Sequence, residues 1–118
     1  MEEWLRSHSE ALAVSDWVVT EFSAALSIKV RTKQIDVEQR VVALVSFSRL
    51  CAENLSLLPV ERRHFRGAAT FAERYERGIK GGDALHLAIA FDHGATLCTL
   101  DRRLNEAGPA LGVATLLV

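Results

Sequence analysis

Apolar residues gather in four short, almost uninterrupted runs, separated by longer stretches in which they recur with a helical period. The four runs cover residues 11–15, 55–60, 95–100 and 113–118, and each predicts a strand that is covered on both faces. The stretches at about 17–32, 36–54, 61–78, 83–93 and 101–111 predict helices. Strands that alternate with helices predict an α/β domain with a mostly parallel sheet.

Residues near the expected helix ends fit this assignment. Asp36 is suited to cap the second helix, and Glu61 is suited to its place in the first turn of the third. Gly78 and the Gly81–Gly82 pair interrupt the chain before the fourth helix, and Gly94 ends it. The chain therefore carries local start and stop signals that agree with its hydrophobic pattern.

Length and composition favour one globular domain spanning residues 1–118. The chain has 118 residues, of which 49% are hydrophobic and 25% are charged, so it can build a core. Its formal net charge of -1 gives no overall basic field of the kind that marks many nucleic-acid-binding proteins. A local basic group is still present in the sequence, formed by Arg62, Arg63, Arg66, Arg74, Arg77 and Lys80.

The cysteines and the absence of a long apolar segment indicate a cytoplasmic protein without a membrane span. Cys51 and Cys98 lie far apart, without the spacing of metal ligands, and both fall in apolar stretches, so we interpret them as reduced core residues. No segment approaches about 18 uninterrupted apolar residues, and the acidic N-terminus lacks the apolar region of a signal peptide.

Glu21 is the most informative acid. At about 100° per residue, the helix predicted at 17–32 has a wide apolar arc, and Glu21 falls inside it between Ala25 and Ile28. A carboxylate on a buried face is costly without a partner. Glu21 is therefore either an arc-edge residue that pairs with a nearby arginine, or part of a functional site, and the spacing leaves both interpretations open.

Asp83 and Asp101 flank the stretch "ALHLAIAFDHGATLCTL" and allow two interpretations each. Each is well placed to be the N-cap of the helix that follows it. Asp101 also follows a strand directly, and sites in open α/β sheets gather at the carboxyl ends of strands. Two acids at that edge would repel each other unless a cation lay between them, so a shared metal is the alternative to two caps.

The remaining polar residues give weaker signals. His86 lies one turn after Asp83 and is most simply a core histidine, whereas Asp92 and His93 precede Gly94 at a helix end and are expected at the surface. The sequence names no partner for His64. The stretch "RRHFRG" is better explained as a solvated helix face than as a nucleic-acid contact, and the sequence contains no glycine-rich phosphate loop.

Four segments, in the order in which they occur, resemble the PIN-domain ribonucleases, and most closely the VapC-type toxins of bacterial toxin–antitoxin pairs. The segment "AVSDWVVTEFSAAL" (13–26) resembles the first acidic helix of that family, with Glu21 at the place of its glutamate. "LLPV" (57–60) resembles the next strand, and "GGDALHLAIAFDHGATLCTLDRRL" (81–104) resembles the family's most recognisable block, with acids at Asp83 and Asp101. The closing segment "GPALGVATLLV" (108–118) resembles the final helix and strand.

The resemblance implies a three-layer α/β/α fold and cleavage of RNA with Mg²⁺ or Mn²⁺ held by clustered carboxylates. Asp83 and Asp101 would be metal ligands, and Glu21 would bind through a water molecule or orient the nucleophile. Hard cations prefer such oxygens, activate water and offset charge on a phosphate. The resemblance also implies a cognate antitoxin protein and a homodimer, for which the apolar residues of helices 17–32 and 36–54 are the expected surfaces.

One departure from the family pattern affects the expected activity. Members of the family normally begin with a central strand that ends in an aspartate ligand, whereas here Met1–His8 resembles the tail of a helix. We therefore expect a domain that is N-terminally truncated relative to the family, with its first central strand missing. The alternative function is a catalytically inactive PIN-like module that binds an antitoxin or partner protein. A small-ligand or signalling domain of flavodoxin-like layout is a third, less favoured hypothesis.

Overall fold

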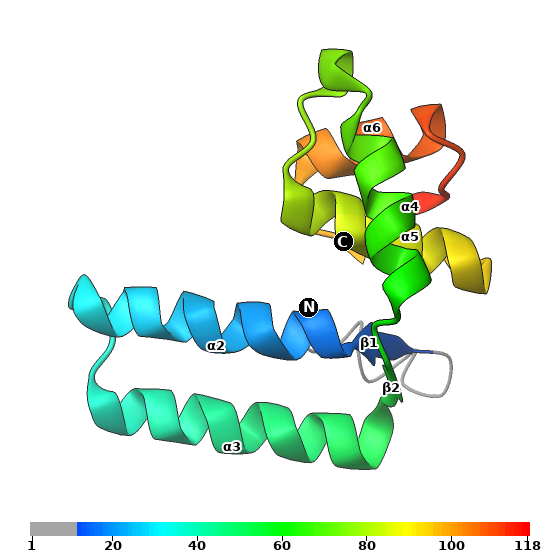
Figure 1. The fold of residues 1–118 in the computed structure, drawn as a ribbon. Coiled ribbons are helices and arrows are strands. Elements are labelled where there is room, and N and C mark those ends of the chain that lie inside the picture. Colours follow the sequence, from blue (N-terminus) through cyan, green and yellow to red (C-terminus); the bar gives the residue numbers. More distant parts are fainter. Residues whose placement is uncertain (1–11) are drawn as a thin grey trace. The chain divides into compact units, whose positions relative to one another are not determined.

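The computed structural model describes residues 12–118, which divide into two compact units, 12–59 and 60–118. The expected helix tail at Met1–His8 lies outside the described residues. Figure 1 shows the course of the chain through both units. The single domain predicted over residues 1–118 stays a prediction. None of the helices in the described part is both long and apolar enough to cross a membrane.

The first unit is a helical hairpin bounded by two short parallel strands. Strand β1 (Ala13–Ser15) leads into helix α2 (Asp16–Arg31), and helix α3 (Val37–Asn54) leads into strand β2 (Ser56–Leu58). The strands pair in parallel with Val14 opposite Leu57. Figure 1 shows α2 and α3 running side by side in opposite directions, and the rings of Phe22 and Phe47 stack between them at 4.2 Å.

Local capping fixes where these helices begin. The side chain of Ser15 accepts a hydrogen bond from the backbone of Val18 at the start of α2. Asp36 caps α3 as predicted, because its carboxylate accepts from the Gln39 backbone at 2.7 Å. The Gln39 side chain in turn accepts from the Asp36 backbone at 2.8 Å, which completes a capping box.

The second unit is built around a buried helix. Its elements are helix α4 (Arg62–Ala72), the short 3-10 helix η2 (Tyr75–Arg77), helix α5 (Gly81–His93), strand β3 (Leu97–Thr99), helix α6 (Arg102–Ala110) and strand β4 (Thr115–Leu117). Six residues of α5 are buried, and the core of the unit joins Leu87 and Ala90 of this helix to Leu104, Leu111 and Val113. Strands β3 and β4 pair in parallel with Cys98 opposite Leu116.

The alternation of strands and helices and the parallel pairing confirm the sequence prediction. Each predicted strand is present but shorter, with three residues in each case. The predicted helix at 61–78 ends at Ala72, and η2 follows it before Gly78. Within the described residues, the four strands form two separate two-stranded sheets, one in each unit.

Candidate active site

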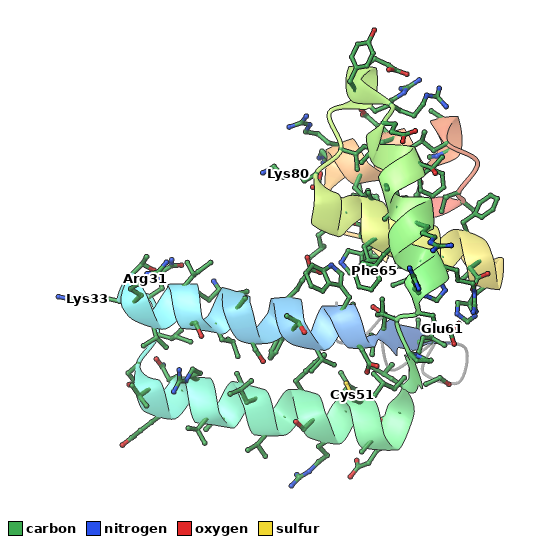
Figure 2. All side chains as sticks on the ribbon, viewed as in Figure 1. Arg31, Lys33, Cys51, Glu61, Phe65 and Lys80 are labelled. Carbon is green, nitrogen blue, oxygen red and sulfur yellow. The ribbon has the colours of Figure 1, made fainter. Side chains whose placement is uncertain are left out.

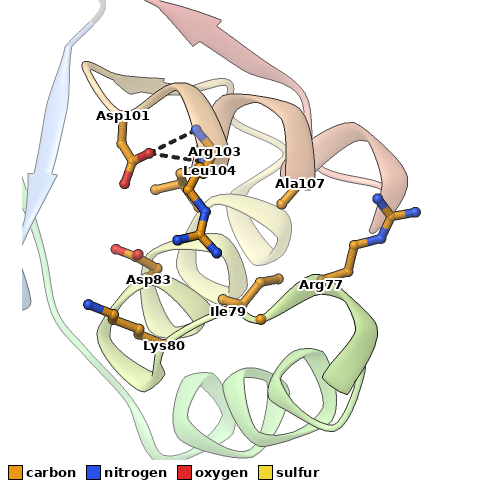
Figure 3. A pocket seen from close by; sticks show the side chains of 9 residues that line it. Arg77, Ile79, Lys80, Asp83, Asp101, Arg103, Leu104 and Ala107 are labelled. Atoms are coloured by element: carbon orange, nitrogen blue, oxygen red, sulfur yellow. Dashed lines mark hydrogen bonds between the residues drawn. The ribbon is translucent and has the colours of Figure 1, made fainter.

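Two of the three acids singled out in the sequence line the same cavity in the second unit. The cavity has a volume of about 100 Å³. It is lined by Arg77, Gly78, Ile79, Lys80, Asp83, Asp101, Arg103, Leu104 and Ala107. Figure 3 shows Asp83 and Asp101 on the same side of this cavity, approaching it from different helices. Residues 18 positions apart in sequence thus meet at one site because α5, β3 and α6 fold back on each other.

Asp83 stands in the first turn of α5 and is half-buried. Its interpretation as the N-cap is wrong, because the helix begins two residues earlier at Gly81 and Lys80 occupies the cap position. An acid in the first turn is still stabilised by the helix dipole. His86 lies one turn later and is half-buried, so it is not a fully buried core histidine.

Asp101 is the N-cap of α6, as predicted, and it lines the cavity as well. Its Oδ1 atom accepts hydrogen bonds from the backbone N–H groups of Arg103 at 2.8 Å and Leu104 at 3.3 Å. Its own backbone N–H donates to Thr99 Oγ1 at 3.0 Å. These bonds hold the carboxylate in one orientation, and Oδ2 is the oxygen that they do not use.

Three basic side chains share the cavity with the two acids. Arg77 comes from η2, Lys80 from the cap of α5, and Arg103 from α6. Three positive charges against two negative ones give the lining a formal net charge of +1. The sequence had placed Arg77 and Lys80 in a local basic group but had not singled out Arg103, whose signal was its position two residues after Asp101.

Glu21 lies on α2, in the first unit, and its side chain is half-buried. The apolar arc around it is less buried than the sequence suggested, since Ile28 is 49% exposed and Val19 is 38% exposed. Leu26 is the buried residue of this helix. The assignment of Glu21 to the same site as Asp83 and Asp101 stays a prediction.

A second polar group in the same unit joins α4 to the end of α5. His64 is 2% exposed, and its Nε2 lies 2.8 Å from Asp92 Oδ2. Arg63 donates to that same oxygen from Nε at 3.1 Å and from a terminal nitrogen at 3.0 Å. These hydrogen bonds to Arg63 and then to His64 lower the pKa of Asp92 to about 2. The sequence had identified no partner for His64, because the two residues lie 28 positions apart.

This group contains the one set of three potential metal ligands that lie close together in residues 12–118. Ligand atoms of His64, Asp92 and His93 fall within 4.8 Å of one another. However, His64 Nδ1 accepts a hydrogen bond from the Glu61 backbone N–H at 2.9 Å, so Nε2 must carry the ring hydrogen and donate to Asp92. A metal at Nε2 would have to displace that hydrogen while Nδ1 could not take it up. The group therefore serves as a structural link between two helices.

Comparison with known proteins identifies the family. The family model described as the PIN domain matches residues 1–108. The chain belongs to the PIN domain family. A search of curated protein sequences gave no match.

A solved structure supports the same fold for this PIN-domain chain. The crystal structure of FitAcB from Neisseria gonorrhoeae matches with a TM-score of 0.71 and 20% sequence identity. The match covers 97% of this chain and 81% of the FitAcB chain. The PIN-like α/β fold predicted from the sequence is therefore confirmed.

The cavity of this PIN-domain chain has the donor set that a divalent cation of the magnesium type prefers. PIN domains are generally nucleases and generally use a divalent metal. Mg²⁺ and Mn²⁺ bind carboxylate oxygens and retain several waters, so two carboxylates facing one small cavity suit them. Asp83 and Asp101 meet that requirement, and Asp101 keeps one oxygen outside its capping bonds.

Proposed function

We propose that this chain is a metal-dependent endoribonuclease toxin of a type II toxin–antitoxin pair, which cleaves RNA phosphodiesters with Mg²⁺ or Mn²⁺. The observation that carries the proposal is the shared cavity of Asp83 and Asp101, with three basic side chains around it. Membership of the PIN domain family supports nuclease activity at the level of the family. The RNA substrate, the metal and the antitoxin partner are the finer parts of the proposal.

Asp83 and Asp101 are the residues that would hold the cation, and Glu21 would complete the site. A divalent cation bound there would act as a Lewis acid toward the phosphate and lower the pKa of water at the site. The protein contributes orientation, because the capping bonds of Asp101 keep its carboxylate fixed without any ligand. Asp83 lies in the first turn of α5, so the helix sets the position of its backbone.

The first unit offers a surface for the proposed antitoxin and for a second copy of the chain. Helix α3 has no buried residue. Four valines on it are more than half exposed, namely Val37, Val41, Val42 and Val45, with exposures of 56%, 52%, 65% and 53%. Such exposed apolar side chains are typical of surfaces that bind a partner. Their exposure supports the proposal that helices α2 and α3 bind protein.

The alternative function is a catalytically inactive PIN-like module that binds an antitoxin or partner protein. The observation that favours it is the balance of charge inside the cavity. Lys80 and Arg103 lie near the two acids and offset them, whereas the Arg77 guanidinium points away from them (Figure 3). One oxygen of Asp101 is committed to the cap of α6. A site balanced in this way can persist without a cation.

Metal binding separates the two functions. Isothermal titration with Mn²⁺ should give one binding site in the unmodified chain. Asp83→Asn and Asp101→Asn should each lower the affinity for Mn²⁺ by about tenfold or more, because losing one charged ligand costs roughly 1.4 kcal/mol or above. Asparagine also caps helices, so the second variant keeps α6 in place. Glu106→Gln, on the exposed part of α6, is the matched control and should leave the affinity unchanged.

Cleavage then tests the reaction itself. A fluorescently labelled single-stranded RNA should be cut in Mg²⁺ by the control variant and not by the two aspartate variants. Equal Mn²⁺ affinities in the chain and in both aspartate variants would remove Asp83 and Asp101 from the proposed site. Binding of Mn²⁺ without any cleavage of RNA would favour the inactive module.

A further inference from the structure

We propose that Arg103 is a phosphate-binding residue that, without metal, serves as the counter-charge of Asp83 and Asp101. The site would then bind RNA and the divalent cation in a coupled way. This inference rests on the proposed nuclease function and names a residue that the acids alone do not imply. It predicts that one substitution changes the affinities for metal and for RNA in opposite directions.

The position of Arg103 is set by the same turn that positions Asp101. The Arg103 backbone N–H donates to Asp101 Oδ1 at 2.8 Å, which fixes the first turn of α6 relative to that carboxylate. Figure 3 shows the Arg103 side chain extending from α6 into the cavity, toward the part that Asp83 and Ile79 line. The guanidinium group of Arg103 and the carboxylates of both acids therefore share one small space.

Gly78 makes room for the guanidinium group. A β-carbon built on Gly78 would lie 3.5 Å from a terminal nitrogen of Arg103, so the two are in contact distance. Gly78 also has a positive φ of 61°, a conformation that glycine adopts without strain. The guanidinium thus lies beside the C-cap of η2, and Arg103, like Lys80, is exposed to solvent, where a phosphate can reach it.

Charge in the cavity explains the coupling. Asp83, Asp101 and Arg103 line one small cavity, so their charges act on one another at short range. Without a metal, Arg103 offsets the acids and competes with a cation for them. Once a cation neutralises the acids, the planar guanidinium becomes available for the oxygens of a phosphodiester, which it can bind in a bidentate way.

Arg103→Met tests this arrangement, because methionine keeps much of the length and removes the charge. Arg102→Met is the matched control, since Arg102 is the preceding residue of α6 and is exposed as Arg103 is, but does not line the cavity. Mn²⁺ affinity is measured by isothermal titration. RNA affinity is measured by fluorescence anisotropy with a short labelled single-stranded RNA, both with Ca²⁺ and with EDTA.

Arg103→Met should bind Mn²⁺ about threefold to tenfold more tightly than the unmodified chain and bind RNA in Ca²⁺ about tenfold more weakly, as expected for one charged hydrogen-bonding group. The slope of log affinity against log salt should fall by about 0.7, the value for one phosphate contact on a single strand. In EDTA the RNA affinities of the two chains should differ much less. Arg102→Met should leave the Mn²⁺ affinity unchanged.

The outcomes separate this inference from the proposed function. If the unmodified chain binds Mn²⁺ through Asp83 and Asp101 but Arg103→Met behaves as Arg102→Met does, the role of Arg103 is wrong and the metal site stands. Weaker binding of both Mn²⁺ and RNA would show that Arg103 only supports the fold, which also overturns the inference. If neither aspartate variant affects Mn²⁺ binding, the proposed function and this inference fail together.

Discussion

Replacing Gly108 with alanine should destabilise the second unit, because no space exists for even one methyl group at that position. A β-carbon there would overlap Thr115 Cγ2 and would lie 3.0 Å from the backbone oxygen of Val113. The Thr115 side chain cannot turn away freely, since its hydroxyl donates to the Asn105 carbonyl at 2.7 Å. The Gly108 carbonyl also accepts from the Val113 N–H at 2.9 Å, which holds the two backbones together.

The expected size of the effect follows from three contributions. Forcing a methyl group into a packed site costs about 1–3 kcal/mol, and loss of the Thr115 hydrogen bond costs about 1 kcal/mol more. Replacing glycine by alanine inside a helix returns about 1 kcal/mol. The net loss in the free energy of unfolding for Gly108→Ala should therefore be about 1–3 kcal/mol.

Gly81→Ala is the matched control, because it is the same substitution at the start of α5, where nothing lies within 4 Å of the new β-carbon. It should leave stability unchanged or raise it by up to about 1 kcal/mol. Urea unfolding followed by far-UV circular dichroism measures both variants. A loss of about 2 kcal/mol should lower the midpoint by roughly 1–2 M. Hydrogen exchange in α6 and β4 should identify the second unit as the part that is loosened.

A second substitution tests the cause. Thr115→Ser removes Cγ2 and keeps the hydroxyl that binds Asn105. In the Thr115→Ser background, Gly108→Ala should cost about half as much as it does alone, because only the contact with Val113 remains. If Gly108→Ala is as stable as Gly81→Ala, or if Thr115→Ser recovers nothing, the steric argument is wrong.

Two further predictions concern polar contacts. The pKa of Asp92 is about 2, below its ordinary value of 3.8, because Arg63 and His64 bind the ionised form. The stabilisation by this carboxylate is therefore complete above about pH 4 and is lost as the pH falls toward 2. The difference in stability between the unmodified chain and Asp92→Asn should shrink over that range. Acid titrations followed by circular dichroism measure this difference. Asp36→Ala should remove the capping box with Gln39 and cost about 1 kcal/mol in urea unfolding, and an unchanged midpoint would contradict the role of that cap.

The sequence by itself determined the elements of this protein. Helix and strand positions followed from the period of apolar residues, and the caps at Asp36 and Asp101 were visible as acids just before a helical pattern. Both signals are local, since a cap hydrogen bond joins residues two or three positions apart. The resemblance of the segment 81–104 to PIN domains also singled out Asp83 and Asp101 before their position in space was known.

Only the tertiary structure decided which side chains meet. The sequence could not place Arg103 in the cavity with Asp83, because their proximity depends on how α6 returns across α5. It likewise gave His64 no partner, although Asp92 lies 2.8 Å away. Such contacts join residues 20 or more positions apart, and no local pattern encodes their distance. They are set by the packing of the core around Leu87, which fixes helices and strands relative to one another within the second unit.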